Sequence, residues 1–108
     1  MELALRDKVA VITGGASGIG RACALRHLEE GGRVSVCGRN ADKLERFREH
    51  CEEAGYGADR VLCRVADAAQ PDALERFADE TVRRFGGLDI WYNNAATGVR
   101  KPLMETRL

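Results

Sequence analysis

A glycine-rich octet between an apolar run and a helical pattern constrains this chain more than any other feature. Residues 13–20 read TGGASGIG. The apolar run at 8–12 is typical of a buried strand, and from Ile19 to Leu28 apolar residues recur every three positions. The glycines are therefore predicted in a strand-to-helix turn. Small residues there allow a tight bend and bring the helix N-terminus close to an anion, so the octet predicts a phosphate-binding turn.

The elements expected after this turn predict the fold class. The further strands are expected at 33–37, 61–65 and 88–93. One helix is expected after Asn40, a suitable N-cap, and another from Pro71, which suits a first helical turn. This alternation predicts an α/β fold, the N-terminal half of a Rossmann-like doubly wound domain with a parallel sheet of strand order 3-2-1-4. No regular element is predicted within 97–108.

Composition and charge exclude several classes of function. The 108 residues suit one small domain, and their 17 basic and 17 acidic side chains cancel without forming a basic patch for nucleic acid or an anionic membrane. No apolar run approaches the roughly 18 residues of a membrane span, and residues 1–7 lack the apolar core of a secretory signal. The four cysteines lack CxxC spacing and are expected as free thiols. We expect a cytoplasmic protein that binds neither nucleic acid nor membranes.

Two motifs resemble those of the short-chain dehydrogenase/reductase family. The octet has the spacing TGxxxGxG, and a second motif follows as Asn93-Asn94-Ala95-Ala96, with Ala96 in place of the family's glycine. The resemblance covers the whole chain but only the cofactor-binding part of the family's fold. It implies that 1–108 is a single NAD(P)-binding domain cut off before the catalytic half. It also implies hydride transfer between NADP(H) and a carbonyl, alcohol or enoyl small molecule, by a parent protein that is a possible homo-oligomer.

The same resemblance assigns the cofactor contacts. The expected residues are Gly14, Ser17, Gly18, Ile19, Gly20, Arg39, Arg64, Val65 and Asn94. Ser17 is expected to donate to a phosphate or ribose oxygen, or to cap the helix, and these two roles are compatible. Asn94 is expected on the ribose side of the cofactor, where it also braces the sheet, and Val65 under the adenine. Arg64 stands where many members carry Asp or Asn, so the adenine contact is expected to be rearranged.

Arg39 governs the expected choice of cofactor. Family members that prefer NAD place Asp where this chain has Gly38, and Arg39 follows directly. A charge-assisted hydrogen bond from Arg39 to a 2′-phosphate is worth roughly 1.5–3 kcal/mol, which favours NADP over NAD by about one to two powers of ten. NAD is the alternative, with Arg39 solvated or stacked on the adenine.

The residues that carry the family's chemistry are not found in this sequence. Neither Tyr56 nor Tyr92 has a lysine four positions further on, so the family's Tyr-x-x-x-Lys pair is missing. His27 and His50 lie on predicted helices without a nucleophile or metal-ligand spacing, and a structural or solvated role is expected for both. No catalytic or metal-binding residue is predicted, and no turnover is expected from these 108 residues. The alternatives are a complete, non-catalytic dinucleotide-binding or interaction module, or a doubly wound fold that binds nothing.

Overall fold

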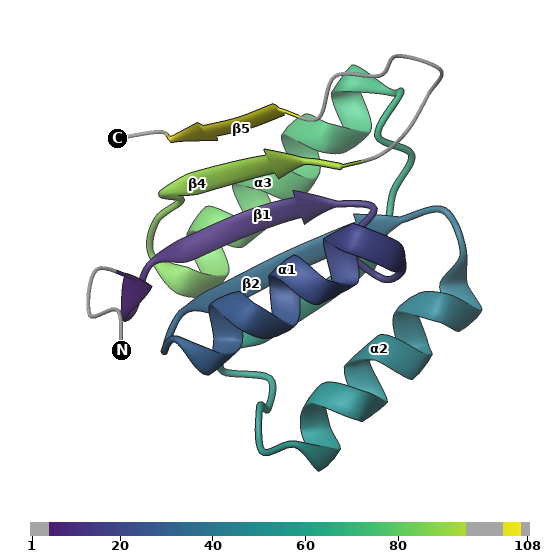
Figure 1. Cartoon of the computed structure of the whole chain (residues 1–108). Helices are drawn as coiled ribbons and strands as arrows, with labels where there is room; N and C mark the ends of the chain where they lie inside the picture. The colour runs from purple at the N-terminus through teal and green to yellow at the C-terminus, as the bar shows by residue number, and fades with distance from the viewer. Residues whose placement is uncertain (1–4, 95–102, 107–108) are drawn as a thin grey trace.

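A computed structural model of the chain describes residues 5–94 and the backbone of 103–106. The elements, in chain order, are β1 (Val9–Thr13), α1 (Gly18–Glu29), β2 (Arg33–Gly38), α2 (Ala41–Glu53), β3 (Val61–Val65), α3 (Pro71–Phe85), β4 (Ile90–Asn93) and β5 (Leu103–Thr106). Within these residues the strands form one five-stranded sheet in the order β3-β2-β1-β4-β5. Helices α1 and α2 cover one face of the sheet and α3 covers the other (Figure 1).

The first four strands confirm the predicted parallel order 3-2-1-4. Strand β1 lies at the centre, with Val11 opposite Ser35 of β2 on one side and Trp91 of β4 on the other. All five residues of β1 are buried, because neighbouring strands flank it and helices cover both of its faces. The carboxyl ends of β1, β2 and β4 therefore meet at one end of the sheet, where the order reverses.

Strand β5 was not expected from the sequence. Leu103–Thr106 pairs antiparallel with β4, with Met104 opposite Tyr92, in a segment for which no element was predicted. The sequence Leu-Met-Glu-Thr does not alternate apolar and polar residues, so it lacks the local pattern of a strand, and the pairing depends on the edge that β4 offers. Strand β4 itself begins at Ile90, two residues later than expected.

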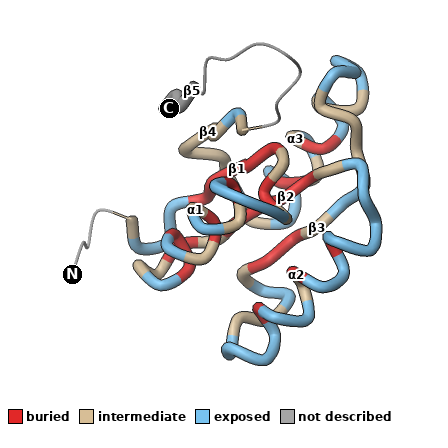
Figure 2. The backbone as a smooth tube through the Cα atoms, turned by 45° about the vertical axis from the view of Figure 1, so that its right-hand side comes forward, coloured by how far each residue is buried: buried red, intermediate tan, exposed pale blue. Residues whose placement is uncertain are grey.

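Apolar side chains pack on both faces of the sheet, and Figure 2 shows the buried backbone running along β1 and β2. The larger cluster lies between the sheet and the two helices α1 and α2, and it includes Ile12, Val34, Val36, Ala24, Leu28, Leu44 and Phe47. On the opposite face, Phe77 of α3 packs with Val11 and Cys37. All four cysteines are free thiols, as expected. Burial raises the pKa of Cys37 and of Cys51 to about 11, which keeps both uncharged.

Two helix starts position the site. Ser17 occupies the N-cap position of α1 with extended backbone, but its side chain makes no capping hydrogen bond. The Asn40 side chain caps α2 as predicted, because its Oδ1 accepts from the backbone N–H of Lys43 at 3.0 Å. Among the described residues, no helix combines the length and the apolar character that crossing a bilayer requires.

Candidate cofactor-binding site

The glycine turn, residues 14–17, joins β1 to the start of α1 at the end of the sheet where the strand order reverses. Gly18 begins α1 at φ +60°, a left-handed conformation, and nothing lies within 4 Å of the place where a Cβ would stand. The first amide N–H groups of a helix have no intrahelical acceptor and carry its partial positive charge. The turn therefore presents an open, anion-attracting helix end, and the Ser17 side chain is exposed beside it.

Gly20 lets this helix end pack directly on the turn. A Cβ at position 20 would lie 2.5 Å from the Gly14 carbonyl oxygen and 2.6 Å from Asn94 Nδ2. Neither distance is compatible with a carbon atom, so any larger residue would push the start of α1 away from the turn. The predicted importance of glycine at this position thus has a steric cause within the protein itself.

Hydrogen bonds at the ends of β1 and β4 brace the turn. Thr13 Oγ1 donates to Asn93 Oδ1 at 2.9 Å and accepts from the Asn94 backbone N–H at 3.0 Å. Asn94 Nδ2 also donates to the Gly14 carbonyl at 3.4 Å. The Gly14 N–H donates to the Cys37 carbonyl at 2.8 Å, so this amide already has an acceptor within the protein. Asn94 therefore ties β4 to the turn, while its predicted contact with a cofactor ribose stays a prediction.

A hollow of about 590 Å³ opens between the glycine turn and the start of α2. We call it the turn hollow, and its lining residues are Gly14, Ala16, Ser17, Gly38, Arg39, Asn40 and Lys43. It brings Ser17 and Arg39 together, two residues that the sequence placed in one site from motifs 22 positions apart. None of the described residues that line it is acidic. The turn hollow is thus a polar recess with two cationic side chains.

Lys43 is a charged lining residue that the sequence analysis missed. Asn40 was predicted to begin the second helix, which places Lys43 at the third helical position, in the first turn after Arg39. A side chain in the first turn of a helix points back toward its N-terminus. The cap prediction therefore placed Lys43 at the same end of the second helix as Arg39, although the recess itself also needs the glycine turn.

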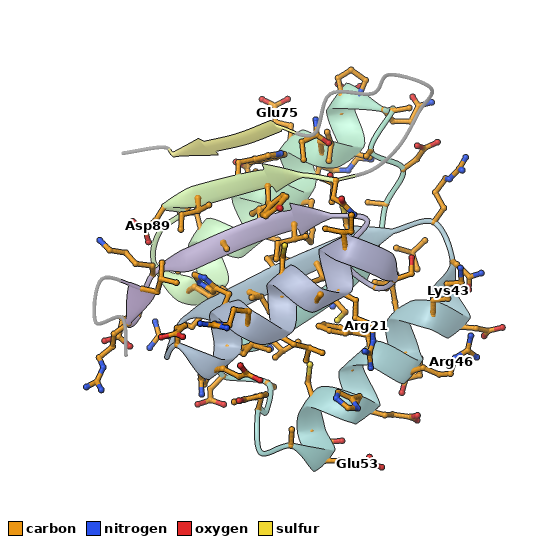
Figure 3. All side chains as sticks on the ribbon, viewed as in Figure 1. Arg21, Lys43, Arg46, Glu53, Glu75 and Asp89 are labelled. Carbon is orange, nitrogen blue, oxygen red and sulfur yellow. The ribbon has the colours of Figure 1, made fainter. Side chains whose placement is uncertain are left out.

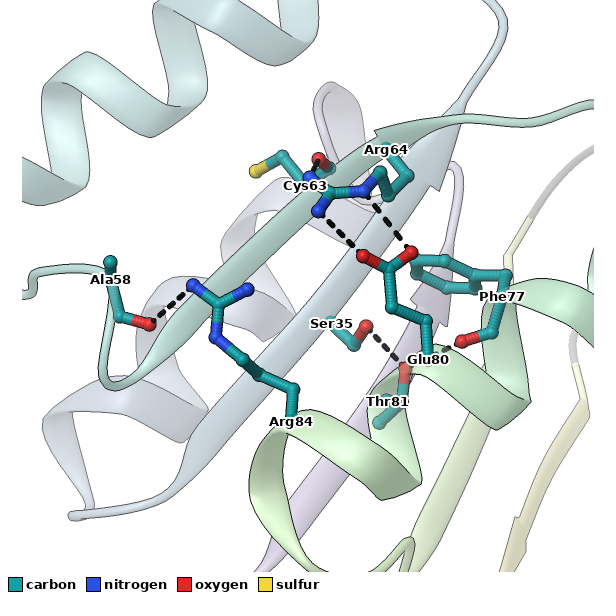
Figure 4. Close-up of polar contacts among 8 residues, drawn as sticks. All are labelled: Ser35, Ala58, Cys63, Arg64, Phe77, Glu80, Thr81 and Arg84. Atoms are coloured by element: carbon teal, nitrogen blue, oxygen red, sulfur yellow. Dashed lines mark hydrogen bonds and ion pairs between the residues drawn. The ribbon is translucent and has the colours of Figure 1, made fainter.

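Arg64, Val65 and Ile19 lie outside the turn hollow. Arg64 Nε donates to Glu80 Oε1 of α3 at 3.1 Å, and Arg64 Nη1 donates to the Cys63 carbonyl at 2.9 Å (Figure 4). Arg64 and the exposed Val65 line a separate hollow of about 540 Å³ between β3 and α3. The Ile19 side chain is 69% exposed and lies in an apolar groove beside α1. The contacts of these side chains with a cofactor stay predictions.

That apolar groove, of about 560 Å³, also contains Tyr92 and Cys23. A hydrogen bond with the Cys23 side chain, together with burial, raises the pKa of Tyr92. His27 lines the groove as well, but it is buried and its Nε2 lies 2.8 Å from the Lys8 carbonyl oxygen. Burial lowers the pKa of His27, so the ring is neutral and donates to this carbonyl, which fits the structural role expected for it.

Comparisons with known proteins give the family. The family model described as short chain dehydrogenase matches residues 8–108. A short chain dehydrogenase/reductase of Macrophomina phaseolina is 38% identical over 92 residues, covering 85% of this chain and 51% of the relative. Glucose 1-dehydrogenase of Gluconobacter oxydans is 34% identical, covering 94% of this chain and 37% of the relative. The chain therefore belongs to the short-chain dehydrogenase family, a family of oxidoreductases.

Solved structures agree with this assignment. L-sorbose reductase of Gluconobacter frateurii superposes with a TM-score of 0.81 at 36% identity, covering 94% of this chain and 38% of that protein. Glucose dehydrogenase of Caenorhabditis elegans gives a TM-score of 0.80 at 38% identity, covering 87% of this chain and 40% of that protein. The chain thus spans about half or less of the length of the relatives that it matches.

Proposed function

We propose that residues 1–108 form the NADP(H)-binding domain of an oxidoreductase, which transfers hydride between the nicotinamide and a carbonyl, alcohol or enoyl group of a small molecule. The observation that carries the proposal is the turn hollow, where Ser17 and Arg39 face one recess without an acidic lining residue. An acidic side chain at the end of β2 would repel a 2′-phosphate, whereas an arginine attracts it. Two related structures contain this cofactor: L-sorbose reductase is complexed with NADPH, and actinorhodin polyketide ketoreductase, 34% identical, is also solved with NADPH.

The residues present fit such a cofactor. The open helix end at Gly18 suits the pyrophosphate, since a Cβ at that position meets no protein atom, and the amides of Ile19 and Gly20 lie in the same first turn. Ser17 would donate to a phosphate or ribose oxygen, and Arg39 would pair with the 2′-phosphate. Asn94 holds the turn against β4 and would face the ribose side. When bound, NADP(H) would give or accept the hydride, while these residues bind and orient the cofactor.

The groups that would exchange a proton with the substrate are not among those predicted in this sequence. In our proposal they belong to the parent protein, which we place in the cytoplasm as a possible homo-oligomer without nucleic-acid or membrane partners. The second candidate function is a non-catalytic dinucleotide-binding module, for which the same hollow would serve. Reading the coding sequence downstream of Leu108 separates the two, because an open frame that encodes Tyr-x-x-x-Lys supports the enzyme and a stop codon supports the module.

Calorimetric titration of the chain with NADPH and with NADH tests the cofactor assignment. We expect NADPH to bind more tightly by about 10- to 100-fold, and Arg39→Asp to abolish or reverse this preference. Arg46→Asp is the matched control, because Arg46 is an exposed arginine of α2 that does not line the turn hollow. Equal affinities in the unmodified chain would contradict NADP as the cofactor. The absence of binding by either dinucleotide would contradict the function as a whole.

A further inference from the structure

Lys43 lies in the first turn of α2. Lys43 lines the turn hollow with Ser17 and Arg39. The backbone N–H of Lys43 donates to Asn40 Oδ1 at 3.0 Å, and this capping hydrogen bond fixes the backbone of the first turn. Figure 3 shows Lys43 at this end of α2 and Arg46 further along the helix. The ammonium group is thus carried by a hydrogen-bonded part of the backbone, on the side of the turn hollow that α2 forms.

The charges around the turn hollow leave Lys43 without an acidic partner. Among the described residues, the ion pairs join Arg26 to Glu30, Arg48 to Glu45 and Glu52, and Arg64 to Glu80. Neither Arg39 nor Lys43 takes part in one, although both are exposed and α2 is rich in glutamate. The nearest acid in sequence, Asp42, does not line the hollow. Two cations therefore face one recess with no carboxylate between them.

A phosphate monoester can use both cations at once. An arginine guanidinium donates through a planar fork to two oxygens, whereas a lysine ammonium acts as a compact point charge on a flexible stem. The dianionic 2′-phosphate has three terminal oxygens, so one cation leaves acceptors available for the other. The pyrophosphate would have a separate positive group at the start of α1, where the first amide N–H groups have no intrahelical acceptor.

We propose that Lys43 is a second determinant of cofactor choice, which binds the 2′-phosphate of NADP(H) together with Arg39. This proposal rests on the function proposed above and names a contact that the glycine motif and Arg39 do not supply. Lys43 acts on affinity for the phosphorylated ribose and takes no part in the chemistry at the nicotinamide.

The experiment uses the whole chain and two nucleotides that need no catalytic residue, adenosine 2′,5′-bisphosphate and adenosine 5′-monophosphate. Affinities are measured by calorimetry for the unmodified chain, Lys43→Gln and Arg46→Gln. Both variants remove one positive charge from an exposed residue of α2, but only Lys43 lines the turn hollow. We expect Lys43→Gln to lower the affinity for the bisphosphate about fivefold or more and to leave the affinity for the monophosphate unchanged. Arg46→Gln should change neither affinity.

Three results would overturn the proposal, and they separate its failure from that of the proposed function. If the unmodified chain prefers the bisphosphate and Lys43→Gln retains that preference, Lys43 makes no contact, although the cofactor assignment stands. If Lys43→Gln and Arg46→Gln lower the affinity for the bisphosphate equally, the effect comes from the change in the overall charge of α2 and not from a contact with Lys43. If the unmodified chain binds the two nucleotides with equal affinity, the NADP assignment itself is wrong, and the role proposed for Lys43 is wrong as well.

Discussion

At the scale of the residue, the strongest steric demand is at Gly20. In Gly20→Ala the new Cβ would meet the Gly14 carbonyl and Asn94 Nδ2, so α1 must move away from the turn. We expect the free energy of unfolding to fall by about 1–3 kcal/mol, as for overpacking elsewhere, with loss of dinucleotide binding. Urea denaturation and calorimetry measure the two effects. Gly87→Ala is the control, since nothing lies within 4 Å of its Cβ, and equal stabilities of the two variants would contradict the close approach.

A second residue, His27, is expected to make stability depend on pH. Burial, and then the positive charge of Arg60, lower its pKa below the usual 6.5, while the hydrogen bond to the Lys8 carbonyl opposes them. The unfolded chain therefore binds a proton more readily than the folded chain does. The stability linked to this ring is complete above about pH 6.5 and falls as the pH drops below it, by at most ~1.4 kcal/mol per pH unit.

The variant His27→Gln isolates this effect, because a glutamine amide can donate to the Lys8 carbonyl and does not titrate. Urea denaturation at pH 7.5 and pH 5.5 should show a smaller loss of stability for His27→Gln than for the unmodified chain. His50→Gln, which changes an exposed histidine of α2, should keep the full loss. An unchanged pH dependence in His27→Gln would show that other groups cause it.

At the scale of the element, two buried hydroxyl groups join α3 to β2. Ser35 Oγ lies 2.6 Å from Thr81 Oγ1, and Thr81 Oγ1 donates to the Phe77 carbonyl at 2.9 Å (Figure 4). A hydroxyl has one proton, so Ser35 is the donor to Thr81. Thr81→Val removes the acceptor of the buried Ser35 hydroxyl and should cost ~1–3 kcal/mol, whereas Ser35→Ala should cost only ~0.5–1.5 kcal/mol.

Urea denaturation of both single variants and of the double variant tests whether Thr81→Val lowers the free energy of unfolding more than Ser35→Ala does. The double variant removes both hydroxyls, so we expect its cost to be smaller than the sum of the single costs. A larger loss in Ser35→Ala than in Thr81→Val would reverse the assignment of donor and acceptor.

The helices and strands differ in how far the sequence could predict them. Residues 61–65 and the helix from Pro71 were placed correctly, because an apolar run and a helical stripe are local patterns. The cap at Asn40 was also local. The pairing of β5 with β4 and the ion pair of Arg64 with Glu80 join segments without such a pattern, so only the folded chain reveals them. Lys43 lies between these cases, since its helix was predicted but the recess that it faces needs the turn as well.

At the scale of the molecule, β3 is an outer strand of the sheet and offers unpaired backbone groups to another chain. Arg64 covers part of this edge. Its guanidinium bonds the Cys63 carbonyl and is held there by Glu80, while Arg84 bonds the Ala58 carbonyl just before the strand (Figure 4). Charged side chains at strand edges oppose edge-to-edge association. The position of Arg64 is therefore explained without a cofactor contact, although the resemblance to the family assigns it one.

Arg64→Ala distinguishes the two roles of this residue. If the guanidinium protects the edge, the variant should self-associate at lower concentration than the unmodified chain, as measured by light scattering during size-exclusion chromatography. Its affinity for adenosine 5′-monophosphate should then be unchanged. Arg76→Ala is the matched control, because Arg76 lines the same hollow between β3 and α3 but joins no ion pair among the described residues. A weaker affinity with unaltered association would instead assign Arg64 to the adenine and would contradict its role at the edge of β3.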